Sequence, residues 1–301
     1  MDWITGIQNA INYIEDHITD ELDYEQIAAE SFSSSFHFQR VFSILCGYTL
    51  GEYIRNRRLT QAGTELANTR EKVIDVAYKY GYDNPESFSK AFQKFHGITP
   101  SQARGSGVML KSFSRLSIKV TLEGGSIMNY RIEDKPAMLL TGYKRRFTGS
   151  PNDKRDQDHN FACETRLEQY ILEGMCREHE MIYQILTNFD ADGYDFYYAY
   201  QFPAWALEDM QEIPADIAAR FENVQIPAGA YIVFETERCK FPTAKMDELR
   251  MKAVSEWLPT SGYELRDAPE IGVIHWFWEE GNDKMNNSRY CEVWLTIKRK
   301  E

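Results

Sequence analysis

The stretch Phe38-Gln39-Arg40-Val41-Phe42-Ser43-Ile44-Leu45-Cys46-Gly47-Tyr48-Thr49 reappears fifty positions later as Phe88-Ser89-Lys90-Ala91-Phe92-Gln93-Lys94-Phe95-His96-Gly97-Ile98-Thr99. A short helical pattern precedes each copy, around Ile27-Ala28 and around Val76-Ala77. Each copy therefore reads as a helix, a tight turn and a second helix, and a repeated helix-turn-helix is a device for reading DNA. The repeat predicts a DNA-binding protein.

Helical signals around the repeat complete an all-α region. Apolar residues at helical spacing predict an opening helix from Ile4 to Ile14, and Leu22 to Glu30 reads as a short second helix. A long helix from Leu50 to Asn68 would span roughly 27 Å, which suits a spacer between two reading helices that meet successive major grooves about 34 Å apart. Asn84 and Pro85 predict the start of the second reading helix.

The exposed face of each reading helix carries side chains suited to DNA. On the first helix, Gln39 and Arg40 lie opposite the apolar stripe and can make bidentate contacts to adenine and guanine edges. The candidate DNA-binding residues of the first helix-turn-helix are Phe36, Gln39, Arg40 and Ser43. Those of the second helix-turn-helix are Glu86, Ser87, Ser89, Lys90 and Lys94.

The formal net charge of −12 is unevenly distributed along the chain. Residues 1–35 hold eight acidic residues and no Lys or Arg, whereas residues 36–104 hold ten Lys or Arg and six acids. Phosphate contacts depend on local basic charge, so the total does not exclude DNA binding, although it predicts weak non-specific affinity. The acidic C-terminal half favours neutral or cationic small-molecule partners.

Length and composition indicate a folded protein with more than one domain. The 301 residues suffice for two domains, and 43% apolar content predicts sizeable cores. The five cysteines are dispersed and odd in number, which favours a reducing compartment. Because the N-terminus shows no signal-peptide pattern and no apolar run approaches membrane-spanning length, we expect a cytoplasmic protein.

The domain organisation follows from these signals and from the strand patterns after them. We expect a DNA-binding domain over residues 1–104, a linker or docked arm over 105–125, and a small-molecule-binding domain over 126–301. Within the middle segment, the alternation in Val108–Leu122 favours a strand or a docked arm over an open linker.

The C-terminal domain reads as α+β. Strands are expected at Ser126–Ile132, Ala137–Lys144, Asp195–Phe202, Phe221–Ile226, Ala230–Thr236, Ile271–Glu279 and Cys291–Lys298, and helices at Cys163–Asn188 and Thr243–Trp257. This order predicts two β-β-α-β-like halves, with a largely antiparallel sheet and helices on one of its faces. The fold class is therefore multidomain, a tandem helix-turn-helix domain followed by an α+β domain.

Alternation along the last strand separates a core face from a face with chemistry. Cys291, Val293 and Leu295 point one way, whereas the other face pairs a carboxylate with aromatic rings. The candidate ligand-binding residues are Glu292, Tyr290, Trp294, Tyr231, Glu235, Tyr198, Tyr200 and Trp276. Aromatic walls around one carboxylate suit a flat or lipophilic cation. The alternative is that these rings belong to the core and that Glu292 is a charge on an edge strand.

The N-terminal motifs carry a family resemblance. They are Ala28, Phe42, Gly47, Arg58-Leu59, Ile74-Asp75-Val76-Ala77, Gly81-Tyr82, Phe88-Ser89-Lys90-Ala91-Phe92 and Gly97-Ile98-Thr99-Pro100. With them, the segment Leu22–Arg104 resembles the AraC/XylS family of transcription regulators. The resemblance implies that both reading helices enter the major groove, the first through Phe36, Gln39 and Arg40, the second through Glu86, Ser87, Ser89 and Lys90.

The C-terminal half resembles the GyrI-like effector-binding domains of multidrug-responsive regulators. The matching stretches are Ile226-Pro227-Ala228-Gly229-Ala230-Tyr231, Glu256-Trp257-Leu258-Pro259, Gly262-Tyr263-Glu264 and Cys291-Glu292-Val293-Trp294-Leu295. The whole architecture is similar to that of Rob-type AraC regulators. The resemblance implies that Glu292 lies at the centre of a pocket for an aromatic or cationic effector, and that the partners are promoter DNA and that effector.

Two other functions remain open for the C-terminal half. Glu292, with Glu235, could activate water in a hydrolase if burial raises a carboxylate pKa towards neutrality. The domain could instead dock a protein partner such as RNA polymerase. A metal site from His159, Cys163, Cys176 and His179 is disfavoured because the two pairs lie more than three helical turns apart. We expect a regulator that is not an enzyme and that needs neither cofactor nor metal.

Overall fold

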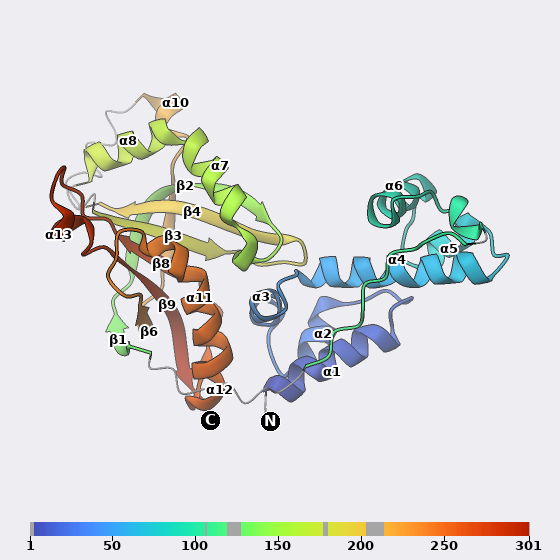
Figure 1. Ribbon diagram of the computed structural model, residues 1–301. Coiled ribbons are helices and arrows are strands. Elements are labelled where there is room, and N and C mark those ends of the chain that lie inside the picture. The colour runs from blue at the N-terminus through green and yellow to red at the C-terminus, as the bar shows by residue number, and fades with distance from the viewer. Residues whose placement is uncertain (1–2, 106, 119–127, 177–179, 203–213, 301) are drawn as a thin grey trace. The chain divides into compact units, whose positions relative to one another are not determined.

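The computed structural model describes residues 3–105, 107–118, 128–176, 180–202 and 214–300. The chain divides into two compact units, Met1–Phe38 with Tyr48–Leu122, and Gln39–Gly47 with Glu123–Glu301. The division falls inside helix α3 (Ser35–Cys46), whose first residues count with the first unit and whose remainder counts with the second. Each unit is therefore described by itself (Figure 1).

The first unit is helical, as the sequence predicted. Its helices are α1 (Trp3–Asp16), α2 (Tyr24–Ala29), the start of α3, α4 (Leu50–Asn68), α5 (Val73–Lys79) and α6 (Pro85–His96). Thr49 caps α4, because its hydroxyl accepts from Glu52 N at 3.2 Å while the Glu52 carboxylate accepts from Thr49 N at 2.9 Å. Asn84 caps α6 by accepting from Glu86 N at 2.7 Å, and Pro85 is the first helical residue.

A buried histidine ties α4 and α6 to the segment that follows them. His96 is 5% exposed, its Nε2 lies 2.9 Å from Leu59 O, and its Nδ1 lies 3.2 Å from Lys111 N. The amide of Lys111 can only donate, so Nδ1 accepts and Nε2 carries the proton that it donates to the Leu59 carbonyl. This tautomer is the neutral one, and burial lowers the pKa of His96.

The segment 107–118 contains no strand and bonds to the helices of the first unit, while residues 119–125 of the expected linker or arm lie outside the described residues. Phe113 N donates to Thr60 Oγ1 at 2.9 Å, and Ile118 N donates to Gln8 Oε1 at 3.0 Å. Arg57 donates to Phe113 O at 2.6 Å and also forms a bidentate pair with Glu15. Arg57 therefore holds the unit together, and its positive charge does not count among those available to DNA.

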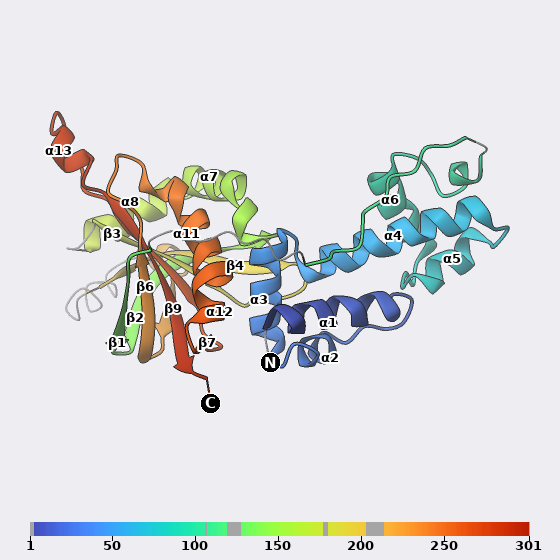
Figure 2. The ribbon, with the colours of Figure 1, turned by 60° about the horizontal axis from the view of Figure 1, so that its bottom comes forward.

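The second unit is a curled antiparallel sheet with helices on one face (Figure 2). Its strands are β1 (Tyr130–Lys135), β2 (Met138–Thr148), β3 (Met181–Thr187), β4 (Gly193–Gln201), β5 (Glu222–Ile226), β6 (Gly229–Glu235), β7 (Tyr263–Leu265), β8 (Glu270–His275) and β9 (Tyr290–Arg299). They pair in the order β1-β6-β9-β8-β3-β4-β2-β5, with β7 on β9, and every pairing is antiparallel. The largely antiparallel sheet is thus confirmed.

The strand order shows how the two halves of this unit join. The first half contributes β1 to β4 and the second contributes β5, β6, β8 and β9. The first strand of each half leaves its own half and pairs with the second strand of the other, as β1 does with β6 and β5 with β2. Strands β3 and β8 join the halves at the centre of the sheet.

Helices α7 (Arg155–Glu164), α8 (Arg166–Met175) and α11 (Met246–Lys252) cover the outer face of the sheet (Figure 1). Helix α11 continues as a π-helical turn over Ala253–Trp257 and then as α12 (Leu258–Thr260). The short helices α10 (Ala215–Ala218) and α13 (Asp283–Asn286) lie in the connections before β5 and between β8 and β9. On α7, Phe161 packs against Tyr143 and Phe147 of β2. Met246 of α11 packs against Ile274 and Cys291. These contacts place the apolar set of the last strand towards the helices, as its alternation predicted.

Several expected elements of this unit differ from the structure. The strand expected over Ser126–Ile132 is observed at Tyr130–Lys135, and residues 126–127 lie outside the described residues. The long helix over Cys163–Asn188 is wrong, because two short helices end at Met175 and strand β3 follows. The run Met181–Leu186 is a short apolar segment that periodicity alone cannot distinguish from a buried helix, and its four central residues are buried on both faces of the sheet. The strand expected over Ile271–Glu279 ends at His275, and the helix expected from Thr243 begins at Met246 after a 3-10 turn.

Candidate functional site

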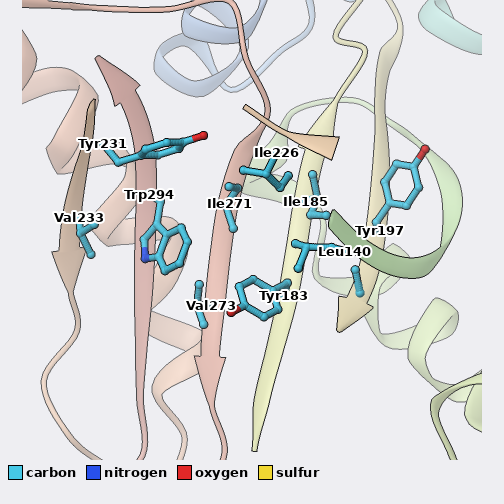
Figure 3. Packing of buried hydrophobic residues seen from close by; sticks show 11 residues of the cluster. Leu140, Tyr183, Ile185, Tyr197, Ile226, Tyr231, Val233, Ile271, Val273 and Trp294 are labelled. Atoms are coloured by element: carbon cyan, nitrogen blue, oxygen red, sulfur yellow. The ribbon is translucent and has the colours of Figure 1, made fainter. Parts of the chain in front are cut away.

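The face of the sheet opposite the helices, called the inner face below, is lined by aromatic and aliphatic side chains (Figure 3). Its buried cluster comprises Leu140, Tyr183, Ile185, Tyr197, Ala199, Ile226, Tyr231, Val233, Ile271, Val273 and Trp294. Strand pairing places Trp294 between Val233 and Ile271, and Glu292 between Glu235 and Val273. Glu292 therefore stands in the same face as the aromatic cluster.

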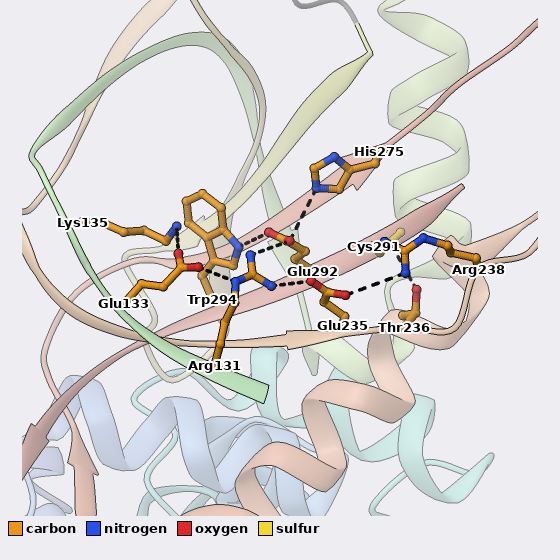
Figure 4. A network of polar contacts seen from close by, with 10 residues as sticks. All are labelled: Arg131, Glu133, Lys135, Glu235, Thr236, Arg238, His275, Cys291, Glu292 and Trp294. Carbon is orange, nitrogen blue, oxygen red and sulfur yellow. Dashed lines mark hydrogen bonds and ion pairs between the residues drawn. The ribbon is translucent and has the colours of Figure 1, made fainter. Parts of the chain in front are cut away.

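Glu292 is a buried carboxylate with directed partners, 3% exposed (Figure 4). Trp294 donates its indole N–H to Glu292 Oε2 at 2.6 Å, and Arg131 Nη2 donates to Oε1 at 2.7 Å. His275 Nε2 lies 3.8 Å from the same Oε1, and the His275 ring stacks on Tyr290 with centroids 4.0 Å apart. Both carboxylate oxygens are thus engaged.

These partners keep the carboxylate charged. Burial alone would raise the pKa of Glu292, but His275, Arg131 and Trp294 outweigh it and lower the pKa to about 2. A general base is most effective when its pKa lies near the working pH. The hydrolase alternative invoked a raised carboxylate pKa at this position, whereas the partners of Glu292 lower it.

Arg131 connects Glu292 to two further carboxylates. It forms ion pairs with Glu133 and Glu235 as well as with Glu292. Lys135, on the same strand β1, bonds Glu133 at 2.7 Å and holds its ammonium 3.8 Å from the centroid of the Trp294 ring. We call Arg131, Glu133, Lys135, Glu235, His275, Glu292 and Trp294 the Glu292 cluster.

The structure brings together some of the predicted ligand-binding residues and not others. Glu292, Tyr290, Trp294, Tyr231 and Glu235 lie on the inner face. Three of them, Tyr198, Tyr200 and Trp276, lie on the opposite face. Tyr198 bonds Asp158 of α7, and Tyr200 bonds Glu173 of α8 at 3.1 Å. Trp276 packs against the cluster formed by Met246, Ile274 and Cys291.

Sequence reasoning missed four residues of the inner face. Arg131, Lys135, Tyr183 and His275 all contact or flank the Glu292–Trp294 pair. For Arg131 and Lys135, the sequence held one usable signal, the alternation of side chains along the short strand Tyr130–Lys135, whose burial alternates residue by residue. Alternation does not reveal the neighbouring strand, because β1 pairs with β6, about a hundred residues away in the sequence.

The predicted DNA-binding residues divide between the two reading helices. On α6, Glu86, Ser87, Lys90 and Lys94 are exposed and Ser89 is half-buried. A shallow hollow on this helix is lined by Pro85, Glu86, Ser89 and Lys90. On α3, Phe36 is half-buried, whereas Gln39, Arg40 and Ser43 are buried. Within the second unit, Arg40 Nη1 donates to Ala268 O at 3.0 Å.

The cysteine–histidine pairs considered for a metal lie apart. Cys163 Sγ is 3.7 Å from His159 Nε2, Cys176 is buried and donates to Gln201 O at 3.2 Å, and His179 lies outside the described residues. Across the described ranges there is no group of three His, Cys, Asp or Glu that could hold a metal ion. None of the helices in that part of the chain has the length and apolar character needed to cross a membrane.

Comparison with protein families gives two matches along the chain. A family model described as an integron-associated effector-binding protein matches residues 131–297, more than half of the chain. A model described as a helix-turn-helix domain matches residues 27–106. The first of these regions holds the sheet of the second unit, and the other holds the helix-turn-helix repeat.

Two transcription regulators and one solved structure show how much of this chain its relatives share. The HTH-type transcriptional activator AarP of Providencia stuartii is 43% identical over 98 residues, which is 33% of this chain and 73% of AarP. The transcriptional regulator Rob of Salmonella typhimurium is 33% identical over 146 residues, and this match spans about half of Rob, 49% of its length. The solved structure of SAV2435 bound to tetraphenylphosphonium has a TM-score of 0.40 and 16% identity, covering 57% of this chain and 94% of that chain.

Proposed function

The chain belongs to the family of integron-associated effector-binding proteins and, through its N-terminal repeat, to the AraC-type transcription regulators, and on that premise we propose that its inner face binds an aromatic or cationic small molecule. It is a DNA-binding regulator with an effector-binding domain. The effector then biases DNA binding or activation by having different affinities for two states of the protein.

One observation carries the effector proposal. Glu292 is a buried, charged carboxylate set among Trp294, Tyr231 and Tyr183 on a single face of the sheet. Aromatic rings attract cations through their faces, and a buried carboxylate adds charge pairing in a place where water does not screen it. A neutral pocket would not need a buried charge, whose removal from water is unfavourable.

Thermal unfolding with matched ligands tests this proposal. The probes are tetraphenylphosphonium, a lipophilic cation, and triphenylphosphine oxide, a neutral molecule of similar rings. A ligand at 100 times its Kd stabilises the folded state by about 2.7 kcal/mol, which is measurable as a raised Tm. We expect the cation to raise Tm of the wild-type chain, and Glu292→Gln to lose most of that increase while keeping any effect of the neutral probe.

A matched variant separates the buried carboxylate from charge in general. Glu264→Gln removes a carboxylate of β7 that is 44% exposed and paired with Lys298, so it should keep the whole cation effect. Equal losses in Glu264→Gln and Glu292→Gln would mean that the effect is non-specific electrostatics. No stabilisation by either probe would contradict the effector proposal and favour a docking role for the second unit, with a protein partner such as RNA polymerase.

For DNA recognition, we propose that the exposed face of α6 meets the double helix. Glu86, Ser87 and Ser89 are then near base edges, and Lys90 and Lys94 near phosphates. The corresponding residues of α3 are Phe36, Gln39, Arg40 and Ser43. Two reading helices with separate roles are consistent with the repeat.

The contribution of Lys90 can be measured directly. Duplexes selected from a random pool by the wild-type protein serve as the targets. Because a phosphate contact acts on every sequence, Lys90→Ala should weaken binding to all selected duplexes and reduce the slope of log affinity against log salt by about 1. Lys79→Ala is the control, since Lys79 is exposed but paired with Glu65 outside α6. Equal slopes for wild type and Lys90→Ala would remove α6 from the DNA interface.

A further inference from the structure

Both groups that would attract a cationic effector already hold cations of the chain itself. The Glu292 carboxylate accepts from Arg131 at 2.7 Å, and the Trp294 ring lies under the Lys135 ammonium at 3.8 Å (Figure 4). Both basic residues come from β1, four positions apart, and Glu133 between them pairs with each. Two side chains of the single strand β1 therefore occupy the positions at Glu292 and Trp294 that a cationic ligand would take.

We propose that Arg131 and Lys135 are tethered stand-ins for the effector, and that an incoming cation binds by displacing them from Glu292 and Trp294. The inference rests on the proposed effector-binding function and deepens it. Arg131 and Lys135 are then specificity-determining residues, because a cation binds only if its interaction with Glu292 and Trp294 is stronger than theirs. A ligand has to replace both the positive charge beside Glu292 and the contact with the Trp294 ring.

Arg131 keeps two of its three charge partners when it leaves Glu292. Three carboxylates surround the Arg131 guanidinium, and leaving Glu292 keeps the pairs with Glu133 and Glu235. The side chains of Glu133 and Glu235 are 36% and 29% exposed, whereas the Glu292 side chain is 4% exposed. The side chain therefore moves from a buried carboxylate towards half-exposed ones, where water solvates the guanidinium as well.

Charge balance explains why displacement is needed. Within the network of Figure 4, the positive charges of Arg131, Lys135 and Arg238 match the negative charges of Glu133, Glu235 and Glu292. In this arrangement each of the three carboxylates is already paired with a cation of the chain. Once Arg131 turns away from Glu292, the buried carboxylate keeps the Trp294 indole N–H and the nearby His275 ring, and a ligand cation takes the place of the guanidinium.

The test uses two probes of the same shape and opposite charge, tetraphenylphosphonium and tetraphenylborate, titrated into the full-length chain by calorimetry. The variants are Arg131→Gln, Lys135→Met, Glu292→Gln and the double variant that combines Arg131→Gln with Glu292→Gln. Removing a competitor that makes a charge-assisted hydrogen bond should tighten tetraphenylphosphonium by about tenfold or more in Arg131→Gln. Lys135→Met should tighten it less, and the double variant should show no gain over Glu292→Gln.

Arg145→Gln is the matched control, because Arg145 has nearly the same exposure as Arg131 and pairs with Glu164 away from the Glu292 cluster. It should bind both probes like the wild type. A melting curve without ligand establishes that each variant is folded. Lys135→Met keeps the aliphatic stem over the indole, so it remains informative even if Arg131→Gln does not fold.

The other outcomes overturn the inference in distinguishable ways. If the wild type binds the cation through Glu292 and Arg131→Gln binds it equally or less tightly, the stand-in role is wrong and the proposed function stands. If the wild type prefers tetraphenylborate and Arg131→Gln loses that preference, Arg131 is itself the ligand contact, for an anion. If wild type and variants bind neither probe, the proposed effector face and the stand-in role both fail.

Discussion

Two buried carboxylates on neighbouring strands of the sheet make a natural comparison. Glu292 of β9 faces the inner side, and Glu270 of β8 faces the helices, where Arg250 of α11 pairs with it. Glu270 and Arg250 are both fully buried, and Asp247 bonds Arg250 at 2.6 Å. Arg131, the partner of Glu292, is 37% exposed by side chain. One ion pair is sealed inside the fold, and the other opens towards solvent.

The difference shows that burial of a carboxylate does not by itself mark a functional site. A sealed pair loses most of its solvation on both sides, so removing either partner leaves an isolated buried charge. A pair with one half-exposed partner can exchange that partner for water or for a ligand. Glu270 and Arg250 therefore lock α11 onto the sheet, whereas Glu292 and Arg131 can open.

The sealed pair should give the largest effect on stability. Arg250→Met leaves Glu270 buried without its counter-ion and is expected to destabilise the second unit by about 3–5 kcal/mol. Urea unfolding of the full chain measures this loss. Lys252→Met, two residues along the same helix, removes an exposed cation paired with Glu248 and should leave the midpoint unchanged. Similar midpoints for the two variants would mean that the pair does not lock the helix.

The open pair should give a smaller effect. Glu292→Gln removes hydrogen bonds to a charged group, but Arg131 keeps two other carboxylates, so the expected loss is about 1.5–3 kcal/mol. Urea unfolding under the same conditions allows a direct comparison with Arg250→Met. A loss as large as that of Arg250→Met would make Glu292 a structural anchor and would break the contrast between the two pairs.

The pH dependence of stability in Glu292→Gln gives a second test of the open pair. The pKa of Glu292 is about 2 in the folded chain against an ordinary 4.5, so the folded state binds fewer protons than the unfolded state between these values. The stability from this charge is complete above pH 4.5 and is lost as the pH falls towards 2. The difference in unfolding free energy between wild type and Glu292→Gln should therefore shrink over this window. A difference that stays constant down to pH 2 would contradict the charge assignment.

Much of the first unit could be predicted because its signals are local. The bounds of α4 fall at Leu50 and Asn68 as expected, and Asn84 and Pro85 start α6 as their types predict. Caps, prolines and apolar spacing act over a few residues, so the sequence carries them directly. In β9 the same locality predicted that Glu292 and Trp294 share a face.

The missed residues have non-local causes. Tyr198 and Tyr200 were grouped with the ligand face because β4 holds aromatic residues on both sides, and only the strands beside it show that Tyr197 is the inner one. The apolar run that forms β3 was assigned to a helix for a similar reason, since its partner strands β4 and β8 lie elsewhere in the chain. Pairing across the sheet settles such choices.

Three features could be read from the sequence alone: the two-part organisation, the tandem helix-turn-helix repeat, and the pairing of a carboxylate with aromatic rings on the last strand. That Arg131 and Lys135 of a distant strand contact this carboxylate and this ring became visible in the folded chain. Helix periodicity and capping depend on neighbours in the chain, whereas an ion pair depends on which strands lie side by side. Here β6 stands between β1 and β9 and brings the three strands into register.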